Sequence, residues 1–232
     1  MTARPTQKIE LRHYYHVYAD GDYKDIVTEH FNALRTSGLL GALSHIHVGF
    51  VGSEENVRSA KQRVSRLTRS FSSNAAPSGW EQETQDFLYR DAREAKRPFL
   101  ALYAHTKGAS DRSEINEVWR KIMTRYTVRD WRNAVASVTG HVGAAGCFWA
   151  PFDNGRLVGE GEMPFFAGTF WWAKSEAIAE IGPPERVDRY DAERWIGKII
   201  KLPQPYNIRC LYETLLELNN LQRAAREMGI AI

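Results

Sequence analysis

Several segments of this 232-residue chain carry side chains suited to holding an anion or moving a proton. In His105-Thr106-Lys107-Gly108, a cation stands beside a glycine that allows backbone amides to approach a phosphate group. Glu193 opens a predicted helix, and a carboxylate facing a pocket can act as general base on a hydroxyl. Gly168 lies just before Trp171 and Trp172, which is typical of a close-approach turn beside a flat apolar surface. This combination is suited to a sugar site.

Each of these features also has a structural interpretation. Lys107 is either a phosphate ligand, together with His105 and Arg120, or a solvated loop cation. Glu193 is either a base or an exposed glutamate in the first turn of a helix, where the helix dipole favours its charge. Asp191 is a candidate acceptor-binding residue, although its place before an apolar stretch favours a helix cap.

The turn at Tyr18 to Asp22 contains clustered carboxylates, which hard divalent cations prefer. Asp and Gly are also the residues expected in a strand-to-helix turn for backbone reasons alone. We favour the turn for Asp20 and Asp22.

Alternating strand and helix patterns run through the chain. Strands are expected at residues 9–19, 45–51, 99–104, 142–148 and 165–173. Helices are expected at residues 23–40, 54–68, 81–96, 114–137, 175–181 (capped by Ser175), 193–200 and 211–228, with a loop at 72–79. This order predicts a single α/β domain in which helices flank a mostly parallel sheet. Ligands of such sheets bind beyond the carboxyl ends of the strands.

Composition sets limits on function. The net charge of +3 is compatible with an anionic ligand but is far from the charge of a typical nucleic-acid-binding surface. The two cysteines match no metal spacing, the histidines form no zinc motif, and no P-loop or serine-hydrolase motif is present. No apolar run reaches the length of a membrane span and no apolar signal core is evident, so a cytoplasmic protein is expected.

Four segments in this order carry a family resemblance: residues 102–108, Trp119-Arg120, residues 166–173 and residues 189–197. Together they resemble small GT-A-type glycosyltransferases of bacteria, phages and large viruses, which share a His-Thr-Lys and Trp-Arg pairing with the related rhamnan-synthesis proteins. The resemblance covers roughly residues 9–200. It implies a GT-A-like (Rossmann-like) domain at residues 1–200. Residues 211–228 carry leucines amid charged residues, a pattern typical of an amphipathic helix, so a helical tail at 201–232 is expected to pack on the body or on a partner.

The resemblance also implies roles for individual residues. Glu193 would be the base of an inverting transferase, Tyr18, Asp20, His105, Lys107 and Arg120 would bind the donor, and Gly168, Trp171, Trp172 and Asp191 would bind the acceptor or sugar. The donor would be a UDP-, GDP- or dTDP-sugar, and the acceptor a glycan or small molecule. Many GT-A enzymes carry an Asp-x-Asp metal motif where this chain has His105-Thr106-Lys107, so weak or absent dependence on manganese or magnesium is expected.

Two other functions fit the same residues. A chain with an altered metal motif is compatible with a nucleotide- or carbohydrate-binding module that performs no transfer. A transferase acting on modified DNA bases is compatible with the basic net charge, although no basic stripe interleaved with aromatic residues is present.

Overall fold

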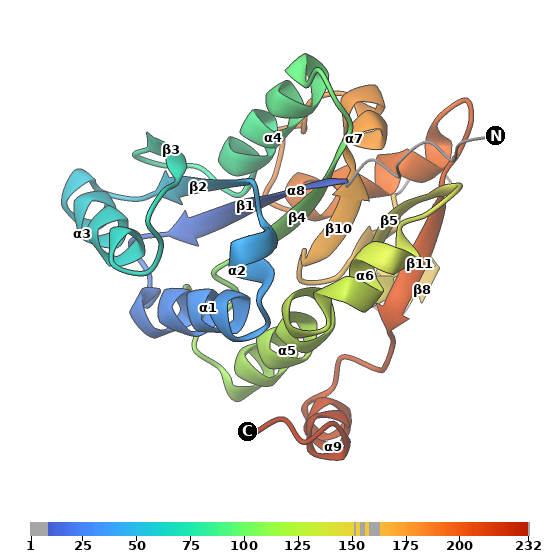
Figure 1. Cartoon of the computed structure of the whole chain (residues 1–232). Helices are drawn as coiled ribbons and strands as arrows, with labels where there is room; N and C mark the ends of the chain where they lie inside the picture. Colours follow the sequence, from blue (N-terminus) through green and yellow to red (C-terminus); the bar gives the residue numbers. More distant parts are fainter. Residues whose placement is uncertain (1–8, 151, 154–155, 158–162, 232) are drawn as a thin grey trace.

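The computed structural model describes residues 9–150, 152–153, 156–157 and 163–231. Its centre is a seven-stranded sheet in the order β11-β5-β10-β4-β1-β2-β3 (Figure 1). The strands are β11 (Asn207–Tyr212), β5 (Val142–Cys147), β10 (Trp171–Lys174), β4 (Phe99–His105), β1 (Glu10–Tyr18), β2 (His45–Val51) and β3 (Ser72–Ala76). All neighbours are parallel except β10, which is antiparallel to both β4 and β5. The mostly parallel α/β sheet predicted from the sequence is confirmed.

Helices cover both faces of the sheet (Figure 1). One face carries α1 (Lys24–Thr36), α2 (Leu39–Ala42), α3 (Glu54–Ser65), α5 (Glu114–Thr124) and α6 (Trp131–Ser137), with a π-helical segment (Arg125–Arg129) joining the last two. The other face carries α4 (Gln82–Glu94), α7 (Ser175–Ile181), α8 (Asp191–Arg194) and a following 3-10 helix (Trp195–Lys201). Short strand pairs join β6 (Trp149–Ala150) to β9 (Phe165–Phe166) and β7 (Phe152–Asp153) to β8 (Arg156–Leu157).

The central strands have two separate hydrophobic cores because successive strand residues point to opposite faces. Along β4, Leu102 packs in the core beneath α1 and α5, whereas Tyr103 packs in the core beneath α4 and α7. A strand covered on both faces reads as a continuous apolar run, which is the pattern that identified residues 99–104.

Three expectations for secondary structure are corrected. The expected loop at 72–79 contains the edge strand β3, whose small polar side chains gave no strand signal. Part of the expected helix at 211–228 is the end of β11, and only α9 (Leu218–Glu227) is helical there. The side chain of Ser175 does not cap α7; its Oγ accepts a hydrogen bond from the backbone N–H of Phe99 (3.0 Å).

Candidate active site

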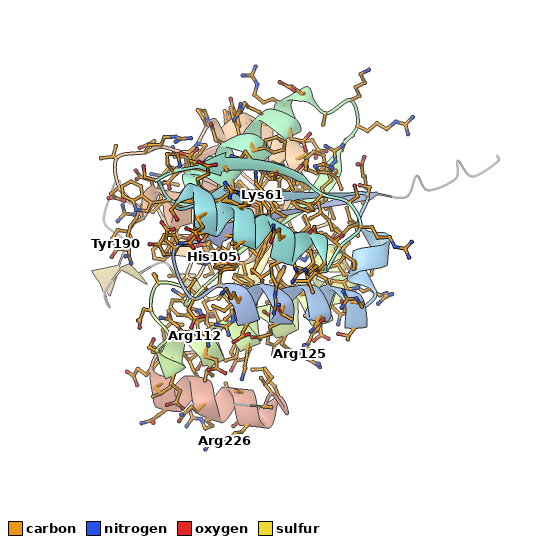
Figure 2. All side chains as sticks on the ribbon, turned by 90° about the vertical axis from the view of Figure 1, so that its left-hand side faces the viewer. Lys61, His105, Arg112, Arg125, Tyr190 and Arg226 are labelled. Atoms are coloured by element: carbon orange, nitrogen blue, oxygen red, sulfur yellow. The ribbon has the colours of Figure 1, made fainter. Side chains whose placement is uncertain are left out.

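A group of ionisable side chains lies at the carboxyl-terminal edge of the sheet. β4 ends at His105 and leads into Lys107, while Glu81 immediately precedes α4 and Glu193 lies in α8. Figure 2 views the molecule from this edge, with His105 toward the middle and Tyr190, at the start of α8, to one side. The doubly wound topology places ligands at this edge.

His105 is held by two partners. Its Nε2 lies 2.9 Å from the carbonyl oxygen of Gly168, and its Nδ1 lies 3.1 Å from Oε1 of Glu81. Burial, with the positive charge of Lys107 beside it, lowers the pKa of His105 to about 3. The Nδ1 contact with Glu81 is within hydrogen-bond distance and joins the start of α4 to the end of β4.

Two carboxyl groups in this site have unusually high pKa values. Burial raises the pKa of Glu193 to about 7, with a further upward contribution from Glu81 and opposing ones from Lys107 and Arg189. Burial also raises the pKa of Glu81 to about 7, against the opposing effects of Lys107 and of a hydrogen bond from Tyr103. Perturbed pKa values of this kind gather at functional sites, because proton transfer at neutral pH requires them.

Lys107 interacts electrostatically with both carboxyl groups. Burial lowers its pKa, while Glu193 and Glu81 favour its charged form. Its ammonium nitrogen lies 4.0 Å from the ring centroid of Trp119, a cation–π contact that holds the side chain in the site. Lys107 is half-buried beside Trp119, and its contact with a phosphate group stays a prediction.

Three predicted site residues have their charged groups engaged elsewhere. Arg120 donates to the carbonyl of Lys107 (3.0 Å) and to Glu29 (3.0 Å), so it fixes the loop after β4. The carboxylate of Asp20 accepts bonds from Ser53 and Asn56 at the start of α3. The carboxylate of Asp191 accepts bonds from the backbone N–H groups of residues 187 and 188. These contacts position loops, and we assign no direct ligand contact to these residues.

The expectation that Trp171 and Trp172 line a sugar site is wrong. Both are fully buried, on opposite faces of β10, in the two different cores. The indole N–H of Trp172 donates to the carbonyl of Thr127 (2.8 Å). Helices on both faces cover these side chains, so neither can reach a ligand.

The positions of Gly168 and Tyr18 are compatible with the predicted site. Gly168 has φ +84°, and its carbonyl is the acceptor for His105, so the glycine turn is joined directly to the end of β4. Tyr18 ends β1, is 37% exposed, and its backbone N–H donates to Thr106 (3.0 Å).

Sequence analysis missed Glu81. Its signal was the same as that of Glu193, a glutamate at the start of a predicted helix. Only the fold shows that the starts of α4 and α8 face the same strand end.

The residues around His105 do not fit a divalent cation. Both ring nitrogens of His105 already have partners, and Lys107 contributes a positive charge. Among the residues that the structure describes, no group of three or more His, Cys, Asp or Glu side chains is arranged to hold a metal ion.

Comparisons with known proteins identify the fold class of the chain. No protein-family model and no curated protein matches the chain. Among solved structures, it is similar to the mannosyltransferase PcManGT from Pyrobaculum calidifontis in complex with GDP-Man and Mn2+, with 14% identity and a TM-score of 0.53 over 90% of this chain. It is also similar to a mycobacterial protein (11% identity, TM-score 0.49, 97% of this chain and 76% of that one).

The likeness to the mannosyltransferase shows the fold, which is the GT-A-like α/β fold predicted from the sequence. The chain spans 58% of that protein's length. Within the described part of the chain, no helix is long and apolar enough to cross a membrane.

Proposed function

We propose that this protein is a glycosyltransferase that moves a sugar from a nucleotide-sugar donor to an acceptor hydroxyl, with Glu193 as general base. The observation that carries the proposal is the carboxyl group of Glu193, whose pKa is raised to about 7, beside Lys107 at the carboxyl-terminal edge of the sheet. A base with a pKa near the working pH is the most effective at removing a proton from a hydroxyl. The fold that the chain shares with a mannosyltransferase supports the same assignment.

The proposed reaction is a single displacement. Glu193 takes the proton of the acceptor hydroxyl as the acceptor oxygen forms a bond to the anomeric carbon of the donor sugar. The bond from that carbon to the diphosphate oxygen breaks, and its electron pair leaves with the nucleoside diphosphate. The ammonium group of Lys107 offsets the charge that develops on the leaving group. Attack opposite the leaving group inverts the anomeric configuration.

The donor is tested first by thermal unfolding with a panel of nucleoside diphosphates and UDP-, GDP- and dTDP-sugars. A nucleotide that binds the folded protein at 100 times its dissociation constant adds about 2.7 kcal/mol to the free energy of unfolding and raises Tm. The donor that gives the shift is then incubated with the protein, and released nucleoside diphosphate is measured. Binding without hydrolysis or transfer would identify a non-catalytic module instead.

The base is tested with Glu193→Gln, which keeps the size of the side chain but cannot accept the proton. We expect the rate of transfer or donor hydrolysis to fall by about 10²–10⁴-fold, with donor binding and Tm retained. The matched control is Glu180→Gln on the exposed surface of α7, which should leave the rate unchanged. Near-normal turnover by a folded Glu193→Gln protein would overturn the assignment.

A further inference from the structure

A groove with a volume of about 750 Å³ lies at the edge of the sheet where β2 and β3 begin. This edge is opposite to the candidate active site, because β1, β2 and β4 are parallel and His105 ends β4. The groove is lined by the end of α1, by α2, by the end of α3 and by the chain that leads from α3 to β3. Its size lies within the range of pockets that hold small organic ligands.

The charged side chains that line this groove are cationic. They are the guanidinium groups of Arg35, Arg66 and Arg69, and His45 adds an imidazole ring. Arg35 donates to the carbonyl oxygen of Leu67 (2.9 Å), so a neutral acceptor holds its charge in place. Arg66 and Arg69 are exposed. Among the residues that the structure describes, no Asp or Glu lines the groove, which we call the basic groove.

Two carboxylates lie just outside the basic groove. Glu10 accepts a hydrogen bond from Ser44 (2.8 Å), a lining residue. Glu10 and Asp91 both form ion pairs with Arg12, at 2.9 and 2.8 Å. Arg12 and the three lining arginines together outnumber these two carboxylates, so the groove and its surroundings carry net positive charge. A ligand that complements this charge is an anion.

The rest of the lining is largely apolar. It includes Leu40, Leu43, Ile46, Leu67 and Phe71, which pack on the core beneath α1. Ile46 is buried, and the other four are half-buried, so they present apolar surface beside the cations. Single-stranded nucleic acid stacks its bases on several aromatic rings, and Phe71 is the one phenyl ring in the described lining. An anionic phospholipid uses both the cations and the apolar surface.

We propose that the basic groove binds an anionic phospholipid. Arg66 and Arg69, together with Arg35, contact the phosphate of the headgroup, and the apolar lining covers the adjoining part of the acyl chains. Binding there brings the amino-terminal edge of the sheet to a membrane surface and leaves the candidate active site facing the water. This inference goes beyond the proposed function, and its test requires no turnover.

Cosedimentation of the full chain with lipid vesicles tests the proposal. We expect binding to vesicles of equal parts phosphatidylcholine and phosphatidylglycerol, and none to vesicles of phosphatidylcholine alone. Arg66→Gln/Arg69→Gln should bind the acidic vesicles about 30-fold more weakly, because each basic residue near such a surface contributes about fivefold to binding. A protein that does not bind the acidic vesicles, or binds both kinds equally, would overturn the proposal.

The matched control is Arg223→Gln/Arg226→Gln, which removes the same charge from the exposed surface of α9. It should bind the acidic vesicles as the unmodified protein does. Equal losses in the two double variants would show that net charge alone attracts the protein, which would overturn the assignment to the groove.

Arg66 also stands at the end of α3, where a cation complements the helix dipole. If that is its whole role, Arg66→Gln/Arg69→Gln lowers Tm and leaves vesicle binding unchanged. This outcome would also overturn the proposal.

Inorganic phosphate and a short DNA duplex distinguish the lipid from other anions. We expect neither to release the protein from acidic vesicles at phosphate concentrations equal to that of the lipid, because neither covers the apolar lining. Release by phosphate would identify a site for the free ion, and release by DNA a nucleic-acid surface; either would overturn the proposal.

Phe71→Ser keeps every cation of the basic groove and removes part of its apolar surface. We expect it to bind the acidic vesicles about fivefold more weakly, since part of the ring is already buried in the free protein. Unchanged binding by a folded variant would show that charge alone is recognised, which would overturn the proposal. If Phe71→Ser does not fold, the competition with phosphate and DNA decides the same question on the unmodified protein.

Discussion

Gly168 contacts the candidate site through its backbone, and its conformation and surroundings both restrict the position to glycine. A Cβ added there would lie 2.7 Å from Sδ of Met123 and 3.1 Å from the ring of Trp119. The residue also has φ +84°, a left-handed conformation that side chains with a Cβ rarely adopt. The turn that accepts the His105 hydrogen bond therefore requires glycine for two separate reasons.

We expect Gly168→Ala to lower the free energy of unfolding by about 2–3 kcal/mol, from backbone strain and crowding together. Gly140→Ala is the matched control, because Gly140 has φ +52° but open space where a Cβ would stand. Gly140→Ala should lower the free energy of unfolding by about 1 kcal/mol, from backbone strain alone. Urea unfolding of both variants measures the difference, and equal costs would show that Met123 and Trp119 accommodate the methyl group.

His105 and Lys107 also lead to a prediction about metal. Both nitrogens of His105 have partners, and in the proposed reaction Lys107 supplies the positive charge that a metal ion would otherwise bring to the leaving group. We therefore expect transfer to continue at nearly its full rate in EDTA and to change little when Mn²⁺ is added. Loss of activity in EDTA with recovery in Mn²⁺ would contradict this.

At the scale of elements, the C-terminal segment contributes both a strand of the sheet and a helix. β11 pairs in parallel with β5 and forms one edge of the sheet, and α9 then packs on α5. Figure 1 shows α9 on the side of α5 that faces away from the sheet. In α9, Leu221, Ala224 and Ala225 are buried against the body, so the amphipathic pattern found in the sequence is the packing face of this helix.

We expect Leu221→Ala to lower the free energy of unfolding by about 2–4 kcal/mol, because it leaves a cavity under α9. Leu215→Ala is the matched control, since Leu215 is 68% exposed. That variant should change stability by no more than about 0.5 kcal/mol. Urea unfolding measures both, and a small effect of Leu221→Ala would mean that α9 contributes little to the stability of the body.

At the scale of the whole molecule, buried histidines make stability depend on pH. Burial is the main cause that lowers the pKa to about 4 for His13 and His47, and to about 3 for His16 and His105. A histidine in the unfolded chain takes up a proton near pH 6.5. The unfolded state therefore binds more protons below that pH, and the stability from these groups is lost as pH falls from about 6.5 toward 3–4.

Glu81 and Glu193 have the opposite effect, because their pKa values are raised to about 7. Their contribution is fully present below the ordinary glutamate pKa of 4.5 and is lost as pH rises through about 7. Since the shifted histidines outnumber these carboxyl groups, we expect the free energy of unfolding to fall between pH 7.5 and 4.5. Urea unfolding across this range measures it, and Glu193→Gln should steepen the fall by removing one opposing group. A constant free energy would show that the histidines are hydrated in the folded protein.

The sequence by itself determined the core of the fold. Continuous apolar runs and helical spacing defined β1, β2, β4 and most of the helices, because burial of a strand on one or two faces leaves a regular pattern along the chain. It also identified His105, Lys107 and Glu193 as candidate site residues, because a strand end or a helix start in an α/β chain faces the ligand edge.

Only the tertiary structure decided which of these residues meet. β3 has a weak strand signal and forms beside β2, where His47 bonds to Ser72 (2.8 Å) and Asn74 (2.9 Å). Trp171 and Trp172 have aromatic side chains of the kind that stack against sugar rings, but helices on both faces of β10 bury them. Glu81 precedes His105 by a helix and a strand and becomes its partner only when α4 crosses back over the sheet. The pattern of apolar residues along a chain indicates which positions are buried. Contacts between distant segments depend instead on how the helices pack on the sheet.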